Sequence, residues 1–371
     1  MLLHGEYKRK ELDIIYKTFM KLFSIKAVKW QSALLLFSSF ALSSCNNPVF
    51  DDEGDCDPHY YVQYIYDMNM EWTDSFNEWV QSVELLVFDS ETGDLVARFH
   101  ETDPSVLSQT GYRMPIDIKP GNYDFVAWCG LENNMEDLFT LESSISHRDH
   151  ARVKLSRQYE EGIAFQDKQL NDVFHGKVNQ TLPDQEGEHV VKIHLIKDTN
   201  NINLSMQHIS GETLTTDMFT ITMSESNGHL AHDNSLIDDE DIEFRPWHLR
   251  SGVVDITGTK AEDGTNLNYF MAEVSTSRLM ANRDTRLNII ENATGNTVYS
   301  IPIVQWVNAF RSQQYKDINN NIHIITDDQE YLDRKSDYEV MLYLDNGEKG
   351  WTAAQIYINS WKVVSSQENL N

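Results

Sequence analysis

Short apolar segments in which every second residue is hydrophobic recur through most of this chain, and they limit the folds open to it. Val191, Ile193 and Leu195 alternate with polar residues, and the segment from Ile202 to Met206 does the same. A period of two is typical of strands with one buried face. Turn signals such as Lys119-Pro120-Gly121-Asn122 separate the segments. The spacing indicates an all-β protein built from antiparallel sandwiches rather than a parallel α/β sheet.

The pattern predicts two groups of strands and few short helices. In the first group we expect strands over Tyr60–Tyr66, Val83–Asp89, Leu95–Phe99, Met114–Ile118 and Tyr123–Cys129. In the second group we expect them over Val191–Leu195, Ile202–Met206, Phe219–Met223, Tyr269–Val274, Arg286–Ile290, Val298–Ile303, Tyr338–Leu344 and Ile356–Val364, with a turn at Asp345-Asn346-Gly347. Helical turns are expected over Asp74–Val80, Gln169–Phe174 and Val304–Arg311.

An acidic, glycine-containing segment, residues 184–188, is the best candidate for a domain boundary. We therefore expect a β-sandwich over residues 58–187 and a second one over 188–371. Residues 45–57 are short, polar and acidic, and they are interpreted as a solvated tether that precedes the first sandwich.

Cys45 follows a segment with the layout of a bacterial lipoprotein signal. Three lysines precede an apolar run from Ala33 to Leu42, and Leu42-Ser43-Ser44 leads into the cysteine. We expect a signal peptide over residues 20–44, cleavage before Cys45 and lipid on its thiol, a strong nucleophile as the thiolate. A short membrane helix is the alternative, but the run is about half the roughly 20 residues that a span needs. Residues 1–19 are interpreted as a start-site overcall upstream of Met20.

The remaining chain is strongly acidic. The full sequence has a formal net charge of −28, and residues 45–371 hold 23 Lys and Arg against 55 Asp and Glu, which is −32. Phosphate backbones and anionic lipid surfaces repel such a protein, so nucleic-acid binding is not expected. We expect membrane contact to come from the acyl chains on Cys45.

Two further cysteines, Cys56 and Cys129, form an even pair once Cys45 is lipidated. A disulfide between them would pin the N-terminal segment to the first sandwich and stabilise it by roughly 4 kcal/mol in the loop-entropy model. The alternative is two small thiols that never meet.

The chain lacks the sequence motifs of common catalytic sites. It has no phosphate-binding loop, no nucleophile elbow and no HExxH zinc motif. His229 and His232 could ligate a metal, and the run Asp238–Asp241 could hold Ca²⁺ loosely, but a solvated loop is the simpler interpretation of both. We expect neither an enzyme nor a metal or cofactor beyond the covalent lipid.

Several distributed segments carry a family resemblance over residues 45–371. They are Cys45, Asp51–Asp57, Val83–Asp89, Tyr123–Gly130, Asp198–Ile202, Asn227-Gly228, Asp233-Asn234, Phe244–Pro246 and Ile356–Val364. Together they resemble the FimB-type family of fimbrial anchor lipoproteins in Bacteroidales. The resemblance implies two tandem transthyretin-like sandwiches, a lipid anchor at the cell outer membrane with a surface-exposed body, and a place at the base of a fimbrium whose length the protein limits.

The last predicted strand is the candidate partner-binding element. Unpaired sheet edges accept a strand from a neighbour through main-chain hydrogen bonds. We expect Ile356, Ile358, Trp361 and Val363, or the tail after them, to engage a fimbrial shaft subunit. An ordinary closing strand is the alternative. The competing functions are a surface glycan-binding lipoprotein, which exposed aromatic rows would favour, and an enzyme, whose sign would be a buried cleft holding a pair of carboxylates with shifted pKa values.

Overall fold

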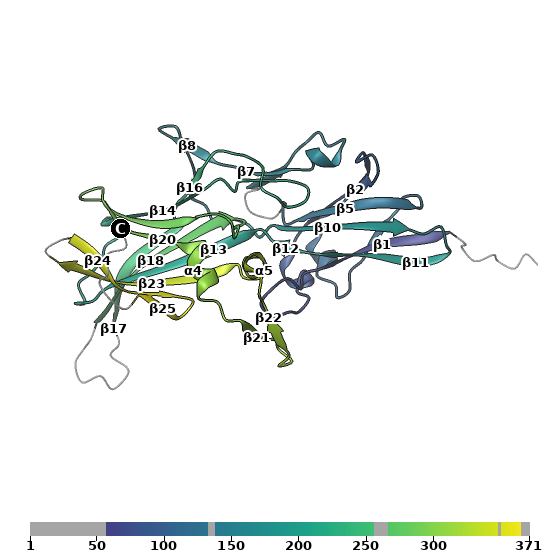
Figure 1. Cartoon of the computed structure of the whole chain (residues 1–371). Helices are drawn as coiled ribbons and strands as arrows, with labels where there is room; N and C mark the ends of the chain where they lie inside the picture. The colour runs from purple at the N-terminus through teal and green to yellow at the C-terminus, as the bar shows by residue number, and fades with distance from the viewer. Residues whose placement is uncertain (1–56, 133–137, 256–265, 348–349, 365–371) are drawn as a thin grey trace, which may run out of the picture. The chain divides into compact units, whose positions relative to one another are not determined.

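The alternating segments form sheets, in agreement with the all-β fold class expected from the sequence. A computed structural model describes residues 57–132, 138–255, 266–347 and 350–364 (Figure 1). The predicted signal peptide, Cys45 and Cys56 lie outside the described residues. Residues from Asp57 onward form one compact unit that contains two hydrophobic cores. Within the described ranges, none of the helices has the length and apolar character needed to cross a membrane.

The N-terminal sandwich consists of two sheets packed face to face around the smaller core. The first sheet has the order β11 (Gly187–His194), β1 (Pro58–Ile65), β4 (Met114–Ile116). The second has the order β12 (Ile196–Lys197), β10 (Phe174–Leu182), β5 (Gly121–Cys129), β2 (Val83–Asp89), β3 (Leu95–Glu101). The enclosed core includes Tyr60, Val62 and Tyr64 from β1 and the apolar side chains of β2 and β5 that face them.

The central strands β2 and β5 are buried on both faces. In β2, Leu85 belongs to the core inside the sandwich and Leu86 to the larger core on the opposite side, and both are fully buried. Phe125 and Trp128 of β5 divide in the same way. The near-continuous apolar run Leu85–Phe88 reflects this double burial, because a strand covered on both faces needs no polar positions.

A segment from the first half of the chain supplies that outer cover. The three-stranded sheet in the order β15 (His229–Leu230), β7 (Val153–Leu155), β6 (Phe139–Leu141) contributes Phe139, Val153 and Leu155 to the larger core. The 3₁₀ turn η1 (Arg148–His150) precedes β7. The segment that carries β6 and β7 therefore connects the outer face of the N-terminal sandwich with β15, which belongs to the second half of the chain.

The C-terminal sandwich is formed by two six-stranded sheets. One has the order β17 (His248–Asp255), β18 (Asn266–Ser277), β13 (Thr199–His208), β23 (Asp337–Gly347), β24 (Gly350–Ile358), β25 (Trp361–Val364). The other has the order β20 (Thr297–Pro302), β19 (Arg286–Glu291), β14 (Phe219–Glu225), β16 (Ile242–Phe244), β9 (Ile163–Gln166), β8 (Gln158–Glu160). Their facing side chains fill the larger core.

The predicted boundary at residues 187/188 does not match the pairing of the strands. β11 begins at Gly187 and runs parallel to β1, with Pro58 opposite Gly187 and Ile65 opposite His194. In the other direction, β8 and β9 belong to the C-terminal sandwich, because β9 pairs with β16 in parallel. β13 and β23 are also parallel. The sandwiches are thus interleaved in sequence and not purely antiparallel.

The helices are short, as expected, but one prediction was wrong. α2 (Phe76–Trp79), α3 (Pro104–Leu107), α4 (Ile303–Ala309) and α5 (Asp328–Arg334) are the α-helices among the described residues. The segment Gln169–Phe174 is irregular and leads directly into β10. α5 was not predicted, although Asp327 caps it by accepting a hydrogen bond from the Glu330 amide at 2.8 Å. The hairpin β21 (Gln314–Lys316) with β22 (Ile322–Ile324) lies between α4 and α5 in the sequence.

Because β2 is buried on both faces, substitutions at its adjacent residues Leu85 and Leu86 should destabilise the protein to a similar extent. Leu85→Ala and Leu86→Ala should each lower the free energy of unfolding by roughly 2–5 kcal/mol, since each leaves a cavity in a different core. Urea denaturation monitored by circular dichroism measures both. A plain two-layer sandwich would expose one of the two side chains, so a Leu86→Ala loss below about 0.5 kcal/mol would contradict the outer cover.

Candidate functional site

The last described strand is an open sheet edge. β25 pairs with β24 on one side and is the outermost strand of its six-stranded sheet, while β17 is the outermost strand on the opposite side. An edge strand presents backbone N–H and C=O groups that no neighbouring strand uses. The main-chain groups of β25 are therefore a candidate binding site for a strand from another protein.

The four predicted partner-binding residues do not lie on one strand. Ile356 and Ile358 end β24, and Trp361 and Val363 lie on β25. Asn359 and Ser360, with φ angles of 46° and 71°, form the two-residue turn between them. Asn tolerates such angles, and two positive φ angles in a row suit a tight hairpin. The single strand expected over Ile356–Val364 was therefore wrong, and the expected turn at Asp345–Gly347 is the end of β23.

Burial separates these four residues further. Ile356 and Ile358 are fully buried in the larger core, so their side chains cannot contact a partner. Val363 is half-buried against the same core. Trp361 is 57% exposed. Of the predicted set, only Trp361 presents a large exposed side chain on the edge.

A transverse row of residues links the two edges of this sheet. Register pairing runs from Arg250 through Met271, Ser205, Met341 and Tyr357 to Lys362. Arg250 therefore lies on β17 at the position that corresponds to Lys362 on β25. The two positions form a matched pair for testing one edge against the other.

The cysteines predicted to form a disulfide remain untested as a pair, because Cys56 lies outside the described residues. Among the described residues Cys129 has no disulfide partner, and its thiol in β5 is fully buried, opposite Val83 and Phe174. Burial raises the pKa of the Cys129 thiol well above its ordinary value. A thiol in this environment is a weak nucleophile.

The candidate metal-binding residues form other interactions. The Asp239 carboxylate lies 2.7 Å from the Arg157 guanidinium, and Glu240 accepts hydrogen bonds from Arg157 and Tyr159. The carbonyl oxygen of His232 accepts a hydrogen bond from the buried His175 ring at 3.0 Å. His229 is partly buried, which lowers its pKa. Among the described residues, no three His, Cys, Asp or Glu side chains are grouped to hold a metal ion.

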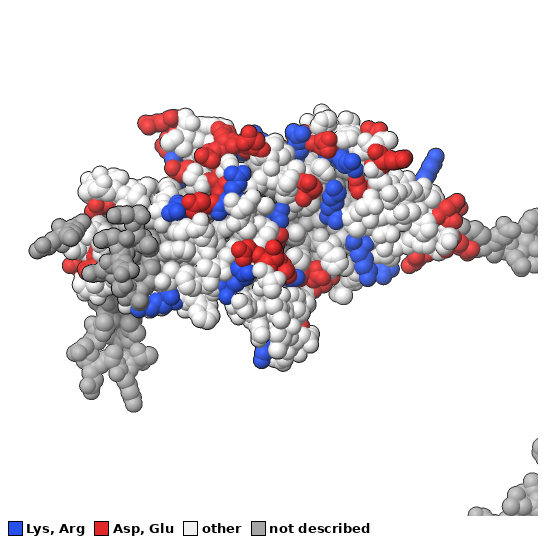
Figure 2. Space-filling view, in the orientation of Figure 1, with Lys and Arg blue, Asp and Glu red and all other residues white. Residues whose placement is uncertain are grey.

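Acidic side chains gather over β8 and β16 on the face shown in Figure 2. Basic groups pair with acidic side chains of these two strands: Arg245 contacts Glu160 of β8 and Glu243 of β16 at 2.7 Å each. The negative charge of the chain is therefore partly neutralised locally. The expectation that the protein does not bind nucleic acid stays a prediction.

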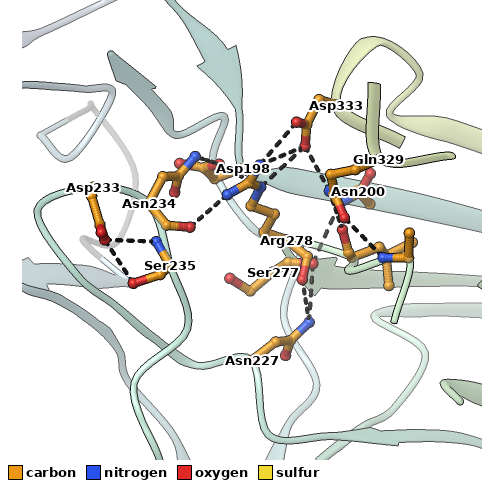
Figure 3. Close-up of polar contacts among 12 residues, drawn as sticks. Asp198, Asn200, Asn227, Asp233, Asn234, Ser235, Ser277, Arg278, Gln329 and Asp333 are labelled. Atoms are coloured by element: carbon orange, nitrogen blue, oxygen red, sulfur yellow. Dashed lines mark hydrogen bonds and ion pairs between the residues drawn. The ribbon is translucent and has the colours of Figure 1, made fainter. Parts of the chain in front are cut away.

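A buried ionic cluster lies where the chain passes from β12 into β13 (Figure 3). Arg278, directly after β18, donates hydrogen bonds to both carboxylate oxygens of Asp333 in α5 at 2.9 Å and to the carbonyl oxygen of Asn234. Its Nε lies 3.8 Å from the carboxylate of Asp198, the residue between β12 and β13. Asp198 is completely buried and also accepts a hydrogen bond from Asn234 Nδ2 at 2.8 Å.

Asparagine side chains extend this cluster along the end of β18. Asn227 donates to Thr276 Oγ1 and to the carbonyl oxygens of Ser277 and Arg278, at 3.0–3.1 Å. Asn200 donates to the same Ser277 carbonyl. These contacts fix the backbone that carries Arg278 (Figure 3).

Three of the segments that carried the family resemblance meet in this cluster. Asp198–Ile202, Asn227-Gly228 and Asp233-Asn234 are separated in sequence but contribute Asp198, Asn200, Asn227 and Asn234 to one network. Arg278 and Asp333, which complete it, were missed. The sequence shows Arg278 and Asp333 only as charged residues near the ends of predicted strands. Many other charged residues have such positions, so these two could not be singled out.

A second contact between the two halves uses an aromatic stack. Arg334 in α5 donates to the carbonyl oxygens of Asp67 and Asn69, at 3.1 and 3.3 Å, and its guanidinium lies 5.0 Å from the Trp72 ring centre. The His323 ring of β22 stacks on Trp72 at 4.4 Å. The loop after β1 is thus tied to the C-terminal half.

These features define an all-β protein of interleaved sandwiches with open sheet edges, a class suited to assembly by strand pairing. The chain belongs to the family of fimbrillin-A associated anchor proteins Mfa1 and Mfa2, whose model matches residues 52–367. Membership supports a fimbrial accessory or anchor role at the cell envelope, with fimbrial subunits as the associated proteins. A comparison with curated proteins found no match.

Solved structures share the fold of this chain. A proposed polysaccharide-binding protein from Bacteroides thetaiotaomicron is 30% identical, with a TM-score of 0.67, and the match covers 84% of this chain and 100% of that one. A proposed adhesin from the same organism is 27% identical, with a TM-score of 0.69, over 84% and 99% of the two chains. The fimbrial anchor protein Mfa2 from Porphyromonas gingivalis, 16% identical with a TM-score of 0.61 over 84% and 100%, shares the fold.

The buried Asp198 predicts a distinctive dependence of stability on pH. Burial raises the pKa of Asp198 to about 7, against the lowering effects of Arg278 and Asn234. Because the folded protein holds a proton that the unfolded chain releases, stability should fall as pH rises from about 4 to 7, by up to about 1.4 kcal/mol per pH unit. Asp198→Asn should remove this slope.

Urea unfolding at pH 5.0, 6.0 and 7.5 measures the slope, with Glu91→Gln, an exposed carboxylate, as the matched control. The free energy of unfolding of the wild type relative to Asp198→Asn should decrease across the series, whereas relative to Glu91→Gln it should stay constant. A constant difference between the wild type and Asp198→Asn would contradict a raised pKa.

Proposed function

We propose that this protein is a lipid-anchored base subunit that attaches a fimbria-like polymer to the outer membrane through Cys45, pairs its β25 edge with a fimbrial subunit and limits the length of the polymer. The observation that carries the proposal is the open edge formed by β25 in a chain of the fimbrial anchor family. A filament that grows by head-to-tail pairing ends at a subunit that can pair on one side only. A subunit held in the membrane by its lipid would be such an end.

The composition of β25 supports strand addition at this edge. It is four residues long, and the side chains of Trp361 and Lys362 are exposed. An incoming strand would gain main-chain hydrogen bonds along β25, and the Trp361 ring would supply apolar contact area beside them. β8, an edge of the other six-stranded sheet, has three exposed residues and an ion pair at Glu160. β8 is also one residue shorter than β25, so it offers fewer main-chain groups to an incoming strand.

In this proposal the lipid on Cys45 holds the protein at the membrane, and the β25 edge binds the fimbrial subunit. The polypeptide between Cys45 and Pro58 can span at most about 45 Å when fully extended, so the acyl chains hold the N-terminal sandwich near the membrane. β25 belongs to the C-terminal sandwich, and the Arg278 cluster joins the two halves. Force on the polymer would pass through this cluster to the lipid.

Glycan binding is a second candidate function. A solved structure that is 30% identical over the full length of that chain is a proposed polysaccharide-binding protein. Exposed tryptophans are the residues that would serve it, and Trp79, which is 45% exposed, is the candidate. The two functions are compatible, since an adhesive assembly can also bind sugars.

Lipid attachment predicts a clear phenotype for one substitution. Cys45→Ala should leave the protein unacylated, so fimbriae should be shed into the medium and be longer than those of the wild type. Immunoblots of cell and medium fractions measure release, electron microscopy measures length, and mass spectrometry of the mature N-terminus measures acylation. Cell-bound fimbriae of unchanged length with an unacylated Cys45→Ala protein would contradict anchoring.

Strand pairing at β25 predicts a difference between the two edges of one sheet. Lys362→Pro removes a main-chain donor from β25 and should abolish attachment of fimbriae to the cell, whereas Arg250→Pro at the corresponding position of β17 should not. Melting temperatures of both variants check that the fold survives. Deletion of residues 365–371 separates the strand from the tail: attachment should persist if β25 is the binding element. Equal loss with both prolines in folded proteins would contradict the choice of edge.

A further inference from the structure

An open cavity of about 320 Å³ lies between α2, the segment before β10, β12 and the first residues of β13 and β23. Its walls include Trp79 and Gln81, the irregular segment Gln169–Asp172, Lys197, Asn201 and Asp337. The volume falls at the lower end of the range for small-molecule sites. The segment that was predicted to be helical thus serves as one wall.

Trp79 is the aromatic residue that lines the cavity, and it is 45% exposed. Lys197 Nζ lies 5.1 Å from the centre of this ring, and it also lies 2.7 Å from the Asp172 carboxylate. The Lys197 side chain is only 4% exposed. The ammonium group is therefore neutralised by Asp172 and holds the Trp79 ring in place, while part of the ring remains open to a ligand.

The cavity floor is held rigidly by backbone contacts. Gly130 has a φ of 77°, and a Cβ atom there would lie 1.9 Å from the Asp172 carbonyl oxygen, so only glycine allows this approach. Asn171 Nδ2 donates to the Gly130 carbonyl at 2.6 Å. Asn171 Oδ1 is buried and has no hydrogen-bond partner among the described residues. The walls are thus preorganised, which lowers the entropic cost of binding.

The opposite wall is fixed as well. Asn201 Nδ2 donates to Asp337 Oδ1 at 3.1 Å, and Asn201 Oδ1 accepts from Ser275 Oγ at 2.8 Å. Both carboxylates of the cavity, Asp172 and Asp337, are therefore already paired with a donor. Each retains further lone pairs that can accept from a hydroxyl group.

The mixture of groups selects the charge and the polarity of a ligand. Carboxamides such as Gln81, Gln169 and Asn171 both donate and accept, as hydroxyl groups do. Two carboxylates and one ammonium leave a small negative excess, which disfavours phosphates and uronic acids. A flat, neutral ring with hydroxyl groups around its edge and an apolar face for Trp79 fits best.

We propose that this cavity is a binding site for a neutral saccharide, with Trp79 stacking on one face of a sugar ring and the surrounding amides and carboxylates bonding its hydroxyls. This inference rests on the glycan-binding candidate function proposed above; the cavity includes no residue of β25, and the inference does not depend on lipid anchoring or strand pairing. A base subunit with such a site could hold a surface glycan while it carries a fimbria.

Saturation-transfer NMR on the purified full-length mature protein tests the site. The probes are neutral tetrasaccharides built from glucose, mannose, galactose, xylose or N-acetylglucosamine, with a tetrasaccharide of galacturonic acid as the charged comparison. At least one neutral probe should bind, and the galacturonate probe should bind at least tenfold more weakly. Trp79→Ala should weaken binding of the neutral probe at least tenfold.

Trp361→Ala is the matched control, because it removes another exposed tryptophan outside the cavity. It should leave saccharide affinity unchanged, and Trp79→Phe, which keeps an aromatic face, should recover part of the affinity lost in Trp79→Ala. Melting temperatures within 2–3 °C of the wild type, the scale of a surface substitution at roughly this chain length, confirm that the variants fold. Absence of binding by every neutral probe, or equal losses in Trp79→Ala and Trp361→Ala, would overturn the proposal.

Discussion

The Arg278 guanidinium, enclosed between Asp198 and Asp333, fixes the point where the chain passes from the N-terminal sheet into the C-terminal sandwich. Burying three ionisable groups is costly, and removing one partner of such a cluster typically destabilises a protein by roughly 3–5 kcal/mol. Asp198 stands where the chain leaves the N-terminal sheet and enters β13. Because Arg278 follows β18 and Asp333 lies in α5, the cluster ties one turn of chain to two elements of the C-terminal sandwich. The raised pKa of Asp198 is the consequence of this complete burial.

A rigid junction gives an anchor protein a continuous path for load. Under the proposed function, tension would enter at β25, cross the sheet through β24 and β23 to β13, and reach the N-terminal sandwich at Asp198. From Asp198 the tension would pass along the chain to β11 and from there to β1. These two strands pair in parallel over eight residues of β1, from Pro58 to Ile65. Parallel strands pulled along their axis share the load among all of their hydrogen bonds. The interleaving of β8 and β9 with the C-terminal sheet adds a second connection between the halves.

Local sequence patterns predicted the strands well and their partners poorly. The prediction for β2 matched both of its ends, and those for β14, β19 and α4 lay within two residues of the observed bounds, because turn residues and alternation mark such elements directly. The pairing of β11 with β1, and of β9 with β16, could not be predicted, since nothing in a short strand encodes a neighbour that lies far away in sequence. Gln169–Phe174 was expected to be helical because its propensities favour a helix, but Asn171 and Asp172 are held by contacts to Gly130. At the candidate site the edge position of the C-terminal strand was anticipated, whereas the Asn359-Ser360 turn, which buries Ile356 and Ile358, was overlooked.

Site-specific photocrosslinking in cells that assemble fimbriae tests the central claim most directly. A benzophenone amino acid replaces Lys362 on β25 or Arg250 on β17, at the two ends of the same transverse row. The account predicts an adduct at position 362 that mass spectrometry identifies as a fimbrial subunit, and no such adduct at position 250. An adduct with that subunit at 250 and none at 362, or equal adducts at both positions, would contradict the assignment of β25 as the edge that holds the polymer.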